Sequence, residues 1–203
     1  SGAKMFTDLD IGFIFTKEIP SMQKFKIPKV NELYAINHLQ DIYHSSKNGE
    51  YAYVGVGLDD MSFIRACLLT RHKMTIDGEN VIVKDRFKSD IKKLGEYLGK
   101  KSFEGSHISH EQMIDKLSNY LGVNIVVFND HLDLASVRYS TDKDATWIFI
   151  LQLELYYFPI IYIKPLGDDD QDIKREFTNS NGIVKRIQNI QPRKTKDSKL
   201  VEE

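Results

Sequence analysis

The chain has 203 residues, 41% of them hydrophobic, and its aromatic residues are eleven Phe, ten Tyr and one Trp. A chain of this length and apolar content can bury a sizeable core in one domain, which excludes a wholly disordered protein. The 28 Lys and Arg residues nearly balance the 29 Asp and Glu residues, so no global charge recruits DNA or an anionic membrane. A single cysteine, Cys67, excludes an intrachain disulfide framework and a thiolate-built zinc site.

The most apolar stretch, residues 147–163, is interrupted by Gln152, Glu154 and Pro159. It is shorter than the ~20 apolar residues that cross a bilayer as a helix, so we expect neither a transmembrane helix nor a membrane partner. No signal peptide is recognised at the N-terminus. We therefore expect an intracellular, cytoplasmic protein in a reducing compartment.

The N-terminal half predicts one short strand and three helices. Asn31 has the position of an N-cap, and Gly99 lies where a C-terminal cap belongs. A glycine-spaced segment, residues 49–57, separates the first helix from the second. The predicted elements are a strand over residues 11–15 and helices over residues 31–43, 63–70 and 85–98.

The second half predicts one helix followed by a run of strands. The helix over residues 109–121 is the clearest, because Ser109 and Gln112 have the spacing of a capping box and Gly122 ends it. The predicted strands cover residues 123–128, 134–139, 151–155 and 160–163. Alternation of Leu and polar residues in the third of these strands predicts one buried face. Helices followed by strands indicate an α+β fold.

The composition changes beyond Pro165. We divide the chain into an N-terminal segment (residues 1–30), a domain (31–165) and a charged, partly mobile C-terminal extension (166–203). Residues 185–199 contain six basic residues and one acid, and the basic residues are Lys185, Arg186, Arg193, Lys194, Lys196 and Lys199. A solvated tail is one interpretation, and a tether for nucleic acid or an acidic partner is the other.

Residues 59–66 form the segment with the most functional information. Asp59 lies three residues before Ser62, and an aromatic–aliphatic pair and Arg65 follow. This segment resembles the first signature of the OTU (ovarian tumour) family of cysteine deubiquitinases, where an Asp lies three residues before the nucleophilic Cys. The resemblance places Ser62 at the position of the nucleophile.

Two further segments extend the resemblance in the same order along the chain. Residues 110–128 look like the family's middle helix and its following core strand, and residues 155–160 look like its closing motif, a His followed by an aromatic residue. The resemblance covers about residues 50 to 163. It implies a papain-like cysteine protease fold, with a central, mostly antiparallel sheet packed between helices.

The resemblance also implies that the catalytic residues are replaced. A thiol protease needs a thiolate and an imidazole that takes the proton and returns it. Ser62 offers only a hydroxyl, and Tyr156, at the base position, offers a phenol, a class of group whose ordinary pKa is ~10. Phe158, where a residue often orients the imidazole, cannot accept a hydrogen bond. We therefore expect Asp59, Ser62, Tyr156 and Phe158 to be degenerate positions of an inactive site without a cofactor.

The resulting hypothesis is a catalytically inactive OTU-like domain that binds or scaffolds proteins. The resemblance makes ubiquitin or a ubiquitin-like protein the first candidate partner, and the family's spread into viruses makes a viral origin, and hence a host cytoplasm, one interpretation. The alternative is an active deubiquitinase whose Cys was replaced by Ser62, but that change would leave Tyr156 and Phe158 unexplained. A nucleic-acid-associated module is the third hypothesis, and it depends only on the basic tail.

Three other residues carry competing chemical hypotheses. Cys67 lies on an apolar helical stripe, so we expect a buried, inert thiol. His107 and His110 could serve as a displaced base, but their position at the start of a capped helix favours surface residues. No Cys or His cluster in the sequence has the ligand spacing of a closed zinc site, so we expect no metal.

Overall fold

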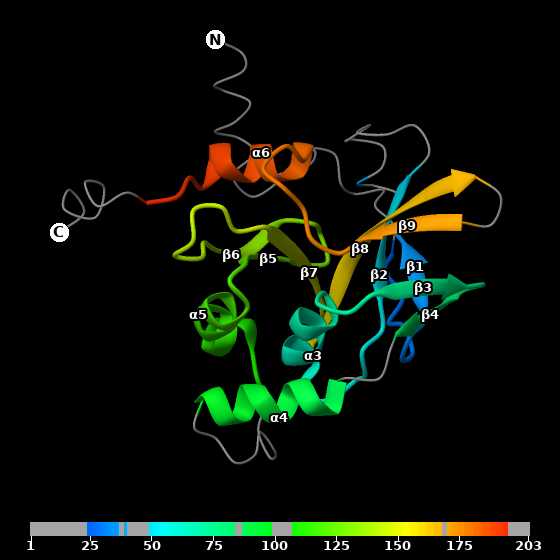
Figure 1. Ribbon diagram of the computed structural model, residues 1–203, viewed down its shortest axis with the longest axis horizontal. Coiled ribbons are helices and arrows are strands. Elements are labelled where there is room, and N and C mark those ends of the chain that lie inside the picture. Colours follow the sequence, from blue (N-terminus) through cyan, green and yellow to red (C-terminus); the bar gives the residue numbers. More distant parts are fainter. Residues whose placement is uncertain are drawn as a thin grey trace, which may run out of the picture.

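The structure is a computed structural model that describes residues 24–36, 39, 49–83, 87–98, 107–167 and 170–194. These residues form one large sheet, one two-stranded sheet and four helices (Figure 1). The large sheet contains β1 (Leu33–Ala35), β2 (Glu50–Val54), β5 (Asn124–Phe128), β6 (Leu134–Arg138), β7 (Trp147–Leu153), β8 (Tyr156–Gly167) and β9 (Asp170–Lys174). The small sheet pairs β3 (Met74–Asp77) with β4 (Asn80–Val83), and the helices are α3 (Ser62–Leu69), α4 (Phe87–Leu98), α5 (His110–Leu121) and α6 (Gly182–Ile190).

The large sheet is mostly antiparallel. Its strand order is β1-β2-β8-β7-β5-β6, and β9 pairs with the C-terminal part of β8. Among the described strands only β5 and β7 run parallel. The predicted α+β class and the predicted mostly antiparallel sheet are therefore confirmed.

Helices cover both faces of the large sheet (Figure 1). On one face, α3 and α5 pack on the strands and α4 packs on α3, whereas α6 lies on the opposite face. Side chains along each strand alternate between the two faces, as strand geometry requires. On β8, for example, Ile161 joins the core beneath α3, and Ile160 joins the core beneath α6.

Three predicted helices are confirmed. Phe63 and Cys67 lie on the buried side of α3, and Leu94 anchors α4. The Ser109–Gln112 capping box starts α5, with the Ser109 N–H donating to Gln112 Oε1 over 3.3 Å. Gly122 ends this helix in the left-handed conformation (φ 65°), where the absence of a Cβ removes the steric cost.

The prediction of a helix from Asn31 is wrong over its first residues. Asn31 has φ 66° and belongs to a turn, and Leu33–Ala35 forms β1 instead. Tertiary pairing overrides the helical spacing, because the Asn31 N–H donates to the Gly55 carbonyl over 2.8 Å and β1 pairs with β2. Leu39 is helical, the rest of the predicted helix after Ile36 lies outside the described residues, and so does the strand predicted over residues 11–15.

The strand predictions in the second half are confirmed for β5 and β6 and corrected for β7 and β8. β7 spans Trp147–Leu153 and is buried on both faces, because helices cover both sides of the sheet. Leu155 falls in the following turn and is exposed. β8 is twelve residues long and includes Pro159, which the sequence had suggested as a boundary. The β3–β4 hairpin was not predicted, although Asp77-Gly78 is a turn signal.

The predicted boundary near residue 165 is not a structural boundary. β8 runs through Pro165 and pairs with β9, so the extension begins inside the sheet. Farther on, α6 buries Ile183, Val184 and Ile187 completely against the large sheet. This stripe was not predicted, because the charges of residues 185–199 obscure the apolar spacing that begins at Ile183. No helix among the described residues is long and apolar enough to cross a membrane.

The packing of α6 generates a stability prediction. Ile187→Ala should lower the free energy of unfolding by about 2–4 kcal/mol, because it removes a fully buried side chain and leaves a cavity. Lys185→Ala, on the exposed side of the same helix, should change it by less than about 0.5 kcal/mol. Urea denaturation followed by circular dichroism measures both values, and equal stabilities would show that α6 is not part of the folded domain.

Candidate functional site

Asp59 holds the turn that leads into α3. Its Oδ1 accepts the Met61 N–H over 2.9 Å, and its Oδ2 pairs with Arg65 Nη1 over 2.7 Å. Its backbone carbonyl accepts the Ser62 N–H over 3.2 Å. Both carboxylate oxygens are therefore engaged in positioning the start of the helix, and Asp59 has a structural role here.

Gly57 makes room for this ion pair. It has φ 113°, a conformation that L side chains rarely adopt, and a Cβ at this position would lie 2.9 Å from Arg65 Nη1. The approach of the Arg65 guanidinium to Asp59 thus requires a glycine. Of the glycines in residues 49–57, Gly57 serves this turn, whereas Gly49 makes room for Tyr162 and Gly55 for the Lys29 carbonyl.

Ser62 is the first residue of α3 and faces the start of β8. Its Oγ accepts the backbone N–H of Tyr157 over 3.0 Å, although the two residues are 95 positions apart in the chain. Ser62 is 1% exposed, and the Phe63 and Tyr157 rings pack edge to face beside it with centroids 4.9 Å apart. The Ser62 hydroxyl is therefore enclosed by the protein.

The Tyr157 hydroxyl is the centre of a hydrogen-bond network. It accepts the His110 backbone N–H over 3.1 Å and the Gln152 Nε2–H over 3.3 Å, and it lies 2.8 Å from His110 Nδ1. Because two donors already occupy the phenol oxygen, the Tyr157 proton points to His110 Nδ1. His110 is then neutral and carries its ring proton on Nε2.

Burial keeps this network in its neutral form. Desolvation raises the pKa of the Tyr157 phenol and lowers the pKa of the His110 imidazole. Both shifts favour the uncharged side chains. The His110 imidazole thus binds the hydroxyl end of the Tyr157 side chain. It does not contact the Ser62 hydroxyl, which lies at the backbone end of Tyr157.

Tyr156 and Phe158 lie on the other face of the sheet from this network. Phe158 is part of the core beneath α6, and Tyr156 packs against that core. Consecutive residues of a strand point to opposite faces, so only Tyr157 points toward α3. Tyr156 and Phe158, the residues that the resemblance assigns to the base and orienting positions, therefore lie on the face of the sheet away from Ser62, and Tyr157 is the residue opposite Ser62.

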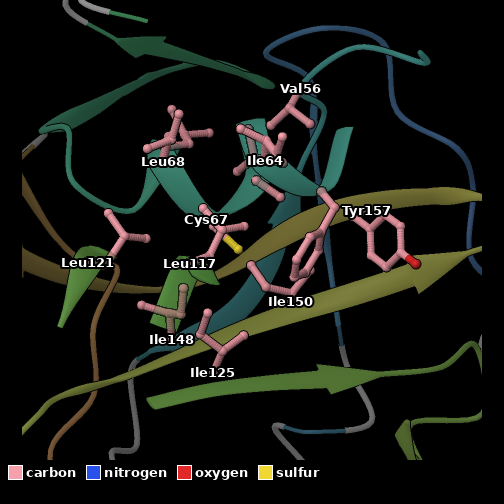
Figure 2. Close-up of a cluster of buried hydrophobic side chains, with 14 of the residues drawn as sticks. Val56, Ile64, Cys67, Leu68, Leu117, Leu121, Ile125, Ile148, Ile150 and Tyr157 are labelled. Atoms are coloured by element: carbon pink, nitrogen blue, oxygen red, sulfur yellow. The ribbon is translucent and has the colours of Figure 1, made fainter. Parts of the chain in front are cut away.

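Cys67 is buried as predicted. It is a free cysteine with no exposed surface, and Figure 2 shows its sulfur among apolar side chains of the α3 core. Burial raises the pKa of its thiol well above the usual range, which disfavours the reactive thiolate.

The two histidines of interest differ in their surroundings. His110 was predicted to be a surface residue but is 6% exposed, because it packs against Tyr157 and Phe63. His107 is partly exposed, and its Nδ1 lies 3.9 Å from Asp60 Oδ1. In the part of the chain that the structure describes, no group of three or more His, Cys, Asp or Glu residues could hold a metal ion.

The basic residues of the C-terminal extension do not form one free tail. Lys185 and Arg186 lie on α6. The Arg193 guanidinium donates to the Ser140 carbonyl and, over 3.3 Å, to the Asp142 carbonyl. Its guanidinium carbon also lies 4.9 Å from the centre of the Tyr139 ring. Arg193 is thus bound to the domain, whereas Lys196 and Lys199 lie outside the described residues.

Hydrogen bonds within the protein engage both polar groups of Ser62, its backbone N–H and its hydroxyl. The Ser62 N–H, at the helix end where an oxyanion would be stabilised, is already donated to Asp59. No base contacts the Ser62 hydroxyl among the described residues. Comparisons with protein-family models, curated proteins and solved structures found no match for the chain.

The Tyr157 network predicts a stability difference between adjacent tyrosines. Tyr157→Phe should lower the free energy of unfolding by about 1–3 kcal/mol, because it leaves the buried His110 and the partly buried Gln152 without their common partner. Tyr156→Phe removes the same atom from a partly exposed residue on the other face and should cost less than about 0.5 kcal/mol. Chemical denaturation of both variants tests the network, and equal losses would contradict it.

The lowered pKa of His110 predicts a pH dependence of stability. Below its ordinary pKa of about 6.5, His110 binds a proton in the unfolded chain but not in the folded protein. The contribution of neutral His110 to the free energy of unfolding should therefore be complete above its ordinary pKa. It should decrease as the pH falls toward the lower pKa of the folded state. His110→Asn keeps an acceptor near the position of Nδ1 but does not titrate. Curves of unfolding free energy against pH for the variant and the unmodified chain should therefore converge as the pH falls. Parallel curves from pH 7 to about 5 would contradict the assignment.

Proposed function

We propose that this chain is a catalytically inactive OTU-like domain that binds a protein partner. The observation that carries the proposal is the meeting of Ser62, at the N-terminus of a buried helix, with Tyr157, at the start of a central antiparallel strand. The resemblance assigns the nucleophile to Ser62 and the base to Tyr156, the residue before Tyr157 on β8. Ser62 and Tyr157 are both buried, and their side chains end in a hydroxyl and a phenol.

Exposed apolar residues beside this site support a binding role. Leu58 is 50% exposed and precedes the Asp59 turn, and Leu155 is 60% exposed in the turn before β8. Each lies within a few residues of the Ser62–Tyr157 contact. Ubiquitin remains the first candidate partner on the basis of the resemblance, and a ubiquitin-like protein is the next.

The inactivity is tested by restoring the two positions. Ser62→Cys alone should not hydrolyse a fluorogenic ubiquitin substrate, because no imidazole is directed at residue 62. Ser62→Cys/Tyr156→His should also be inactive, since position 156 points to the other face. Ser62→Cys/Tyr157→His places an imidazole on the same face of the sheet as the thiol, but both positions are buried, so a ubiquitin substrate should not reach them and this variant should be inactive as well. Hydrolysis by Ser62→Cys alone would contradict the proposal and support an active enzyme with a replaced nucleophile.

Partner binding is tested with ubiquitin itself. Adding the protein to isotope-labelled ubiquitin should shift ubiquitin resonances, and Leu58→Asp or Leu155→Asp should weaken the affinity about tenfold or more. Leu166→Asp is the matched control, because Leu166 is 63% exposed but lies at the far end of β8. Absence of shifts, or equal loss in the control, would contradict ubiquitin binding at this surface.

A further inference from the structure

A second candidate site lies on the α6 face of the sheet, away from Ser62. A cavity of about 430 Å³ opens where β8 and β9 meet the segment that leads into α6. Tyr51 and Tyr162 form its floor as register partners on β2 and β8, with ring centroids 4.8 Å apart. Their side chains belong to the core beneath α6, so the cavity and the Ser62 network are separated by the sheet.

Two lysines border this cavity from neighbouring strands. Lys174 is the register partner of Tyr162 on β9, and Lys164 follows Tyr162 by two residues on β8. Residues two apart on a strand, and partners across strands, share one face of the sheet. Both lysines therefore project from the face that carries the tyrosine floor, and both are exposed.

Hydroxyl groups complete a wall rich in hydrogen-bond donors. Thr178 Oγ1 and Ser180 Oγ lie 2.7 Å apart and share one hydrogen bond. A pair of hydroxyls that shares one bond retains one proton for another acceptor. Together with two ammonium groups, the wall suits a ligand that has several acceptor oxygens.

The charged groups around the cavity have a net positive charge, even when the nearby acidic groups are counted. Glu176 lines the cavity, but its Oε1 lies 3.1 Å from Arg71 Nη1 and its Oε2 accepts the Thr146 hydroxyl over 3.1 Å. Asp172 is the register partner of Lys164 and offsets one ammonium charge without lining the cavity. One positive charge remains for an anionic ligand.

We propose that this cavity binds the phosphate group of a small molecule, either inorganic phosphate or a phosphate monoester such as a nucleoside monophosphate. Phosphate oxygens are acceptors that match two lysines and a hydroxyl proton. The volume falls within the range of about 300–1,000 Å³ that small-molecule sites occupy, which favours a monoester over the bare ion. This inference does not depend on the proposed function, because it concerns other residues on the other face of the sheet.

Calorimetric titration at low salt tests the proposal with three probes: inorganic phosphate, adenosine 5′-monophosphate and adenosine. The intact chain should bind the monophosphate, bind phosphate more weakly and fail to bind adenosine. Lys164→Gln/Lys174→Gln should weaken monophosphate binding about tenfold or more, because each lysine supplies a charge-assisted hydrogen bond. Lys185→Gln makes the same kind of charge change at an exposed residue of α6 outside the cavity and should bind like the unmodified chain.

The measured affinities distinguish a phosphate site in this cavity from a nucleic-acid surface. Thermal midpoints should stay unchanged in both variants, since the replaced lysines are exposed. No heat with either phosphate probe, equal affinity in the double variant, or equal binding of adenosine would each overturn the proposal. A single-stranded oligonucleotide that binds far more tightly than the monophosphate, with the same dependence on Lys164 and Lys174, would assign the lysines to a nucleic-acid surface and overturn the small-molecule site.

Discussion

The burial of both faces of the central strands is the constraint on which the rest of this structure depends. β7 and β8 lie in the middle of the large sheet with α3 and α5 on one side and α6 on the other. A strand in this position has no solvent face, so each residue must fit one of two cores. Along the first eight residues of β8, even-numbered residues pack toward α6, whereas Tyr157, Ile161 and Ile163 pack toward α3. A shift of one residue along β8 would therefore change which side chain of the strand faces Ser62.

Tyr157 connects the packing of the α3 core with a buried hydrogen-bond network. Its ring closes the α3 core against Phe63, and its hydroxyl satisfies His110 and Gln152, which belong to different elements. The Tyr157 side chain thus stabilises this junction at the strand whose backbone meets Ser62. A buried hydroxyl with all its hydrogen bonds formed is costly to replace, which favours retention of the tyrosine.

The sheet separates two surfaces that differ in chemistry. The surface beside Ser62 combines exposed leucines with the Asp59–Arg65 pair, which suits contact with a protein. The cavity on the α6 face has lysines and hydroxyl groups around a tyrosine floor, which suits a small anion. In the C-terminal part that the structure describes, α6 and Arg193 bind to the domain on the side of the second surface.

The sequence by itself determined the elements whose signals are local. Capping residues and apolar spacing predicted α5 and α3, and runs of β-branched residues predicted β5, because these signals depend on neighbours a few positions away. The sequence also identified the segment with Asp59 and Ser62 as informative, through its resemblance to a protease signature. In the structure, Asp59 stabilises the turn that leads into the helix.

Only the tertiary structure decided which distant side chains meet. The turn at Asn31 depends on the pairing of β1 with β2, and the burial of His110 depends on Tyr157, which is 47 positions away. The choice of Tyr157 over Tyr156 needs knowledge of which face of β8 lies beneath α3. Apolar residues on both faces of a buried strand leave no alternation in the sequence, and for this reason the pattern alone could not make that choice.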